Sequence, residues 1–361
     1  MNIEINYASI LEKIDRVDPI RYGKTRNYLS GAVTYLSPYI SRGVISTKQV
    51  CEGVLKRGYA VHEMESFLQE LAWRDYWQQI WIQRGEGINE DIRQPQPRAE
   101  RDGIPSSILQ HKTGIEAIDK SIQSFYNTGY LHNHSRMHIA SLATNVGRCV
   151  WMEPAQWMYY HLLDADWASN ALSWQWVCGA KSNKLYFANQ ENINKYCNSS
   201  QTKTFLDVSY DEIESIGVPH ELQDIERFKL KTILPQTITP IVRKGEPCFI
   251  YNFYNLDPLW RKDEAGARIL LLEPSVFERY PVSEKSIQFC LDLAKENIPN
   301  IQIHVGEFSE LKRTTNAHFI FKEHPLNKYE GIQDERDWMS NVKGEYNSFF
   351  AFWKKVKKEL Q

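Results

Sequence analysis

The 361-residue sequence lacks the features that would assign it to several specialised classes of protein. Its six cysteines are scattered without a C-x-x-C pair, which argues against zinc and iron–sulfur sites and fits reduced thiols. No apolar run reaches membrane-spanning length, and no signal-peptide pattern is present. The sequence therefore predicts a cytoplasmic protein that uses neither a metal nor a membrane.

The sequence also lacks an excess of charge of one sign. Lys and Arg number 43 against 45 Asp and Glu, which leaves a formal net charge of −2. Any nucleic-acid site must therefore be a local basic rim, because phosphate contacts dominate the affinity of such sites.

Aromatic residues, by contrast, are abundant at 12%, and they concentrate in residues 128–176. Charged groups among so many aromatic side chains are costly to bury unless they are paired. Arg136 therefore needs an anion, and Asp164 or Asp166 is the candidate in the same stretch. Two interpretations are open: an aromatic cavity that holds a planar cofactor beside an Arg–Asp pair, or a helical core with one buried ion pair.

Apolar periodicity predicts helices over residues 63–84 and 133–146. In the first helix, Glu70, Trp73 and Arg74 fall on neighbouring turns, as they also would in a plain amphipathic helix with a surface ion pair. The polar segment 85–113 is predicted to be a long loop.

The C-terminal region alternates expected strands with an amphipathic helix and ends in a basic helix. This order predicts a small parallel α/β layer. The strands are expected at 267–273, 301–305 and 318–322, the helix at 283–297 and the basic helix at 348–358. We therefore predict a mainly α protein with a helical domain (1–200), a connector (201–240) and a small α/β domain (241–361).

The polar residues of the aromatic stretch stand in a recognisable order. T-G-Y-x-H-N-x-x-R-M, then Trp151, then D-x-D-x-A-x-N and W-Q-W, resembles the flavin domain of the photolyase/cryptochrome family, and most closely that of cyclobutane-dimer photolyases. The resemblance implies a helical FAD-binding domain. The family normally carries an α/β domain before it, and here we expect the C-terminal α/β region in its place.

The resemblance implies a set of FAD-binding residues. Asn170 matches the position beside flavin N5, and the photolyase branch typically has Asn there. Val33 departs from the Thr expected in the phosphate-binding segment. The implied cofactor residues are Tyr22, Thr34, Leu36, Ser37, Arg74, Asn133, Arg136, Asp164, Asp166 and Asn170.

The resemblance also implies substrate and electron-transfer residues. Asn133 and Met137 stand where enzymes that repair (6-4) photoproducts carry histidines, which favours the cyclobutane dimer. His134 replaces a usual Arg, and Arg98 stands where the outermost tryptophan is often found. The implied substrate residues are Glu70, Trp73, Asn133, His134, Met137 and Trp176, and the implied catalytic residues are Asn170, Glu70, Trp174 and Trp151.

Three functions follow from these residues. The first is FAD-dependent, blue-light-driven repair of cyclobutane dimers in damaged DNA by a deoxyribodipyrimidine photolyase-like lyase. The second is a cryptochrome-like photoreceptor that signals through a protein partner. The third is a member of the fold that has lost the flavin, which only Val33 supports.

Overall fold

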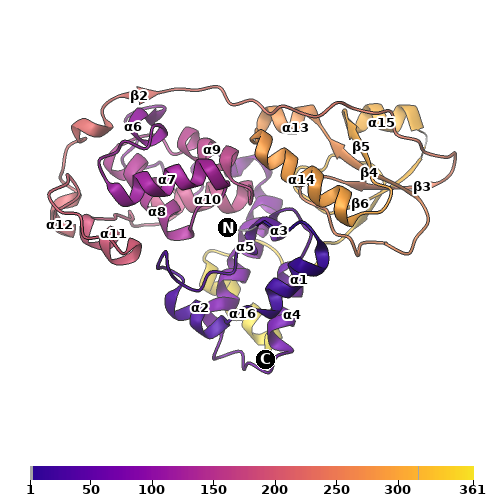
Figure 1. The fold of residues 1–361 in the computed structure, drawn as a ribbon, viewed down its shortest axis with the longest axis horizontal. Coiled ribbons are helices and arrows are strands. Elements are labelled where there is room, and N and C mark those ends of the chain that lie inside the picture. The colour runs from indigo at the N-terminus through magenta and orange to yellow at the C-terminus, as the bar shows by residue number, and fades with distance from the viewer. Residues whose placement is uncertain (1–2, 316) are drawn as a thin grey trace.

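The computed structural model describes residues 3–315 and 317–361, and it places a group of helices beside a parallel β-sheet (Figure 1). The sheet lies on the right of the view in Figure 1 and the helical part lies on the left and below. The helices up to residue 200 are α1 (Tyr7–Asp15), α2 (Pro19–Thr25), α3 (Ser37–Ser41), α4 (Thr47–Leu55), α5 (Glu65–Arg84), η1 (Gly85–Asn89), α6 (Ser106–Leu109), α7 (Glu116–Thr128), α8 (Asn133–Ser141), η2 (Leu142–Val146), α9 (Met152–His161), α10 (Trp167–Val177) and α11 (Gln190–Cys197).

Helix α5 is the central element of the helical part. It ends at Gly85, whose φ of +52° is readily adopted only by glycine. Its buried side chains include polar Gln78 and Gln79 besides large aromatics, so they are not confined to one stripe. A helix with this burial pattern is enclosed on several sides, and α2, α4, α10 and the C-terminal helix all contact it.

The helix expected over residues 133–146 changes its winding partway along. Residues Asn133–Ser141 are α-helical, and Leu142–Val146 continue as a π-helix. The backbone N–H of Gly147 donates to the Leu142 carbonyl five residues earlier, and the Thr144 hydroxyl donates to the Ala140 carbonyl. Such π-segments are frequent at functional sites.

The C-terminal sheet has five strands in the order β5-β4-β3-β6-β7, and all neighbouring strands are parallel. The predicted parallel layer is therefore confirmed, but the sequence analysis missed its central strand β3 and its edge strand β7. The strands are β3 (Pro247–Tyr251), β4 (Ala267–Leu272), β5 (Gln302–Val305), β6 (His318–Lys322) and β7 (Ile332–Asp334), with helices α13 (Pro274–Arg279), α14 (Glu284–Asn297) and α15 (Phe308–Thr315) between them.

The segment between the two parts is mostly irregular and runs along the upper edge of the molecule in Figure 1. It contains α12 (Tyr210–Ile213) and η3 (His220–Leu222). It also contains β2 (Ile225–Glu226), which pairs antiparallel with β1 (Ile104–Pro105) of the helical part. The predicted loop 85–113 is therefore held in place by short elements and a strand pairing.

The two parts share a hydrophobic core. Phe249 and Tyr251 of β3 belong to the same buried cluster as the helices, whereas Cys248 and Ile250 belong to a smaller cluster on the other face. This alternation follows from the two-residue repeat of a strand. Among the residues described, no helix is long and apolar enough to cross a bilayer.

Helix α16 (Phe349–Leu360) packs against α5, although its sequence position assigns it to the expected C-terminal domain. The Phe349 ring stacks on the Trp73 ring, with centroids 3.8 Å apart and an interplanar angle of 9°. Trp353 Nε1 and Lys357 Nζ bond the Glu65 carboxylate at 2.9 and 2.7 Å. The last helix therefore completes the core of the helical part.

We predict that Phe349→Ala lowers the free energy of unfolding by about 3 kcal/mol, because it removes a buried aromatic ring. The neighbouring Phe350 is 68% exposed, so Phe350→Ala is the matched control and should cost less than about 0.5 kcal/mol. Urea unfolding followed by circular dichroism measures both values. A double-mutant cycle with Trp73→Ala should give a coupling of about 1 kcal/mol, and a coupling near zero would contradict the stacking.

The pH dependence of stability should report on Asp75. Burial raises the pKa of Asp75 from 3.8 to about 6, against the opposing hydrogen bonds from the Met339 N–H and the Thr47 hydroxyl. Between these values the folded protein keeps a proton that the unfolded chain has released. The free energy of unfolding should therefore rise as the pH falls through this window, by about 3 kcal/mol in all.

The slope of unfolding free energy against pH between 4 and 6 is the measurement (a window on the order of that set by the two pKa values). Asp75→Asn should flatten the slope, whatever its effect on absolute stability. The exposed Asp15→Asn is the control for losing a surface carboxylate. An unchanged slope in Asp75→Asn would show that this proton is not taken up.

Candidate functional site

A cavity of about 470 Å³ opens between α5, α8, α10 and the segment that leads into α3. A volume of this order is typical of small-molecule and cofactor sites. The ten predicted cofactor residues, from Tyr22 to Asn170, all contribute to its wall. The structure thus brings together side chains that lie up to 148 positions apart in the sequence.

Arg136 and Asp164 form an ion pair in the wall of this cavity. Arg136 Nη2 lies 3.0 and 2.9 Å from the two Asp164 oxygens, and its Nε donates to the Leu131 carbonyl at 2.8 Å. The Asp164 side chain is only 3% exposed and that of Arg136 is 23% exposed. The expectation that Arg136 has an anionic partner in this stretch is confirmed, with Asp164 as the partner.

Asp164 remains ionised in spite of its burial. Burial alone would raise its pKa, but Arg136, Arg74 and the hydroxyl of Ser37 outweigh that effect and hold the pKa below its ordinary value. The wall therefore presents a fixed negative charge next to a guanidinium that still reaches the cavity.

Asp166 has a different role from Asp164. Its carboxylate accepts the Ser169 N–H at 2.7 Å and so caps the N-terminus of α10. It also accepts Gln78 Nε2 of α5 at 2.5 Å. Asp166 therefore fixes the start of the helix that carries Asn170 and Trp174.

The amide of Asn170 is held in one orientation. Its Nδ2 donates to the Ala155 carbonyl at 2.8 Å, and a carbonyl oxygen can only accept. No described residue donates to Asn170 Oδ1, so this oxygen can accept a hydrogen bond from a ligand in the cavity. An acceptor at this place suits a ring nitrogen that carries a proton.

Hydroxyl and guanidinium groups gather at another part of the wall. Arg74 Nη1 donates to the Ser41 hydroxyl at 2.7 Å, and that hydroxyl donates to the Asp164 carbonyl at 2.9 Å. Thr34 and Ser37 line the cavity close by, together with Val33. These donors fit phosphate oxygens.

The predicted substrate residues line the same cavity, with one exception. Glu70, Trp73, Asn133, Met137 and Trp176 all contribute to the wall. Glu70 pairs with Arg26 at 3.0 Å, and burial raises its pKa while Arg26 opposes the rise. Trp176 is 39% exposed, which places its ring at the rim.

His134 and Trp151 are the predicted residues that the structure does not bring to the cavity wall. His134 follows Asn133 on α8 and so points about 100° away around the helix. Its buried ring packs on Tyr196 and His138, and burial lowers its pKa to about 4. Trp151 is buried, and its Nε1 donates to Asp91 at 2.8 Å.

The sequence analysis gave no role to several residues that line the cavity, among them Arg26, Trp77, Tyr130 and His132. Arg26 offered a usable signal, because it stands one helical turn after Tyr22 in α2. Tyr130 lies between two residues of the quoted motif, and only the cavity shows which way it faces. Burial raises the pKa of the Tyr130 hydroxyl, so it stays a neutral hydrogen-bonding group.

Helical elements, an aromatic cavity and a buried Arg–Asp pair together define a flavin-binding domain of the photolyase class. Residues 67–209 match the family model described as the FAD binding domain of DNA photolyase. This part of the chain belongs to that family, and its cofactor is FAD. The cavity volume, the acceptor on Asn170 and the donors near Arg74 fit this group.

Individual relatives carry the same description. A deoxyribodipyrimidine photo-lyase of Synechococcus sp. is 25% identical over 64% of this chain and 47% of its own. A deoxyribodipyrimidine photo-lyase of Streptomyces griseus is 30% identical over 41% of this chain and 32% of its own. The chain thus spans a third to a half of the length of these curated relatives.

A solved cryptochrome structure from Synechocystis sp. is also similar. It covers 54% of this chain and 44% of its own, at 19% identity and a TM-score of 0.48.

We predict that Arg136→Met lowers the free energy of unfolding by about 3 kcal/mol, because it leaves the Asp164 carboxylate buried without its cation. Purified Arg136→Met should also carry less FAD, measured by flavin absorbance after denaturation. The control is Arg16→Met, whose pair with Glu12 is 76% and 62% exposed and should be worth less than about 0.5 kcal/mol. Equal losses in the two variants would contradict a structural role for the cavity pair.

Proposed function

We propose that this protein is a FAD-dependent, blue-light-driven enzyme that splits cyclobutane pyrimidine dimers in DNA. One observation carries the proposal: Glu70, Trp73, Asn133, Met137 and Trp176 line the same cavity as Asn170 and the Arg136–Asp164 pair. A protein that only senses light has no need of polar and aromatic groups arranged for a damaged base beside its flavin site.

The wall offers what a base pair flipped out of the duplex requires. Extrusion costs a few kcal/mol of lost stacking, which aromatic side chains can restore. Trp176 at the rim supplies such a ring, and Met137 supplies a flat apolar surface beside it. The Glu70 carboxyl, aligned by Arg26, accepts or donates hydrogen bonds to the base edges.

Asn170 is the proposed catalytic residue nearest the flavin ring. FAD supplies the absorption of light and the transfer of an electron when it is bound. Asn170 Oδ1, fixed by the bond from Nδ2 to Ala155, favours the ring form that carries a proton at its facing nitrogen. Its amide cannot donate a full proton, so it holds that proton in place without exchanging it.

Trp174 and Trp151 are the proposed internal electron donors. Trp174 is 2% exposed and lines the cavity, so its ring can contact the cofactor directly. Trp151 lies farther inside, and the Asp91 carboxylate accepts its Nε1–H at 2.8 Å. A carboxylate in this position stabilises positive charge on the indole when an electron leaves it.

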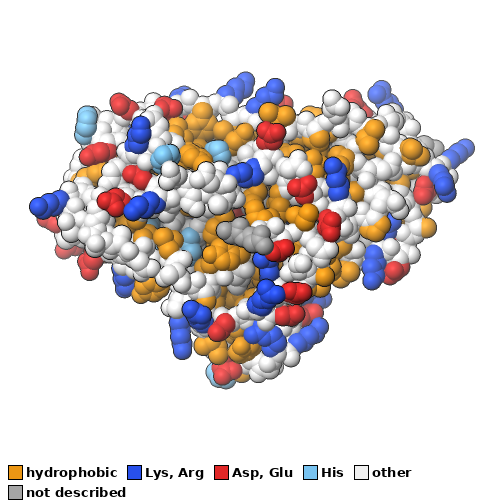
Figure 2. All heavy atoms as spheres, in the orientation of Figure 1, with side chains coloured by type: hydrophobic (Ala, Val, Ile, Leu, Met, Phe, Trp, Pro, Cys, Tyr) orange, Lys and Arg blue, Asp and Glu red, His pale blue; other side chains and the backbone are white. Residues whose placement is uncertain are grey.

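The alternative function is a cryptochrome-like photoreceptor, and specific contacts favour it. His134 is buried and neutral, so it contributes no cation for a DNA phosphate. One face of Trp73 is already covered by Phe349. Lys and Arg are also interspersed with Asp and Glu over the face in Figure 2, without a basic stripe.

Blue-light exposure of the purified protein with dimer-bearing single-stranded DNA separates these functions. We expect dimers to disappear in the light and not in the dark. Trp176→Ala should slow repair about tenfold, the loss of roughly one stacking contact, with its FAD retained. Tyr210→Ala removes an aromatic side chain that is 49% exposed and lies outside the cavity wall, so it should leave repair unchanged.

Other outcomes have defined meanings. Bound and photoreducible FAD without repair would establish the photoreceptor function. A colourless protein that does not take up added FAD would contradict both functions. Repair that is unaffected in Trp176→Ala would remove this residue from the substrate site.

A further inference from the structure

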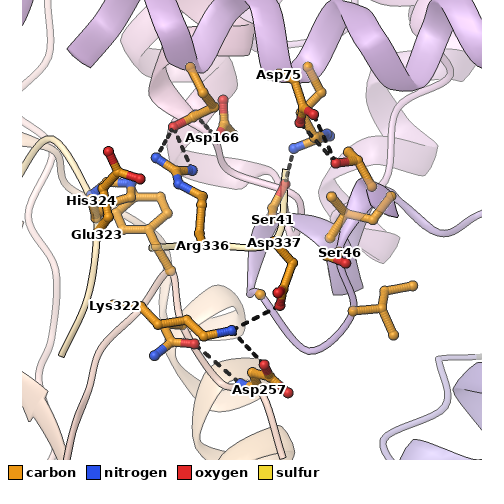
Figure 3. Close-up of a pocket in the computed structure, with 18 of the residues that line it drawn as sticks. Ser41, Ser46, Asp75, Asp166, Asp257, Lys322, Glu323, His324, Arg336 and Asp337 are labelled. Atoms are coloured by element: carbon orange, nitrogen blue, oxygen red, sulfur yellow. Dashed lines mark hydrogen bonds and ion pairs between the residues drawn. The ribbon is translucent and has the colours of Figure 1, made fainter. Parts of the chain in front are cut away.

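A second, smaller cavity lies at the carboxyl edge of the sheet, facing the helical part (Figure 3). The chain leaves β3 toward β4 and β5, and returns to the other side of β3 as β6 and β7. In open parallel sheets, ligands bind outside the strand ends at this switch point. The cavity lies at that place, because residues that follow β3 and residues at the end of β6 line it.

Three unpartnered hydrogen-bond donors belong to the residues that line this cavity. The first is Nε2 of His324, a residue only 8% exposed. His324 Nδ1 accepts the Leu326 N–H, so the proton of the neutral ring sits on Nε2. Burial, with Arg336 and Arg42 nearby, holds the pKa of His324 well below its ordinary value, so the ring is neutral.

The other two unpartnered donors are Asn255 Nδ2 and Arg336 Nε. Asn255 is 7% exposed, and its Oδ1 already accepts from the Asp257 N–H. Arg336 donates Nη1 and Nη2 to the Gln78 amide oxygen at 3.0 Å each. Within residues 3–315 and 317–361, no carboxylate comes within ion-pair distance of Arg336.

The acidic residues around the cavity do not satisfy these donors, because most already have partners. Asp75 accepts from Thr47 and Met339. Asp257 and Asp337 both bind Lys322, at 2.6 and 3.1 Å, as Figure 3 shows. The unpartnered acceptor in this wall is one oxygen of Glu323.

The lining therefore presents more unused donors than unused acceptors. We propose that this cavity binds a small oxyanion, a phosphate or carboxylate group, through His324 Nε2, Asn255 Nδ2 and Arg336 Nε. Its volume is about 80 Å³, which is room for roughly five to eight water-sized groups. That space matches the few heavy atoms of phosphate or of a short carboxylate, and it is far too small for a dinucleotide.

The oxyanion site shares a wall with the flavin cavity. Ile40, Arg74 and Asp166 line both cavities. Arg336 also reaches Asp166 through Gln78, by the two hydrogen bonds described above. An anion on Arg336 is therefore connected to the cap of α10 without entering the flavin site.

Isothermal titration calorimetry of the full chain with inorganic phosphate, sulfate, acetate and glycolate tests this proposal. We expect saturable binding of at least one of them, and the preferred ion distinguishes a phosphate ligand from a carboxylate ligand. His324→Leu and Arg336→Met should each weaken binding about tenfold or more, the size expected for one hydrogen bond to a charged group.

Matched controls are His220→Leu and Arg313→Met, which remove the same side chains from exposed positions. Both should bind the anion as the natural protein does. A melting curve for each variant shows that it is folded, and Asn255→Ala replaces any variant that is not. The proposal is overturned if no ion binds saturably, which would mean that the cavity holds only water, or if the His324 and Arg336 variants bind normally.

Discussion

The short buried segment from Asp164 to Asp166 joins most of the structure through its polar groups. The Asp164 carboxylate binds Arg136 of α8, and its carbonyl accepts the Ser41 hydroxyl of α3. The Ala165 carbonyl accepts the fully buried Arg42, and the Asp166 carboxylate binds Gln78 of α5 while it caps α10. Buried polar groups are tolerated only when they are bonded in this way.

This arrangement determines where open space remains. Helices α3, α5, α8 and α10 are held around one segment by hydrogen bonds of fixed length, so their side chains do not close over the centre. The flavin cavity lies on one side of the segment. The smaller cavity lies on the other side, where Gln78 passes from Asp166 to Arg336 of the C-terminal region. One backbone turn therefore forms part of the boundary of both sites.

The sequence predicts the features that depend on local periodicity and on the ordered motif. Helix α5, the parallel layer and the anion beside Arg136 are examples. It does not predict which of two aspartates pairs with Arg136, because both lie in the same motif and only the start of α10 separates them. Strand β3 was missed because its apolar run is short and begins at a proline, a pattern that turns share.

Contacts between distant segments explain the remaining differences. Helix α16 reads as amphipathic and basic, and nothing in its own pattern shows that its apolar face covers Trp73. The smaller cavity likewise depends on loops that follow β3, β6 and β7, and these residues become neighbours only when the strand order is known. Asp166 and His134 show the same limit at the scale of one helical turn.

The stacking of Phe349 on Trp73 also bears on how a base would be held in the main cavity. A ring stacked at 3.8 Å leaves no room for a second ring on that face of Trp73. Trp77 packs at a tilt against the same indole, with centroids 4.8 Å apart, and restricts it further. If a flipped base enters, Trp176 must therefore provide most of the stacking surface, with Trp73 offering its remaining edge. The C-terminal helix then acts on substrate fit without touching the substrate, because it sets the position of the indole that forms the opposite side of the cavity.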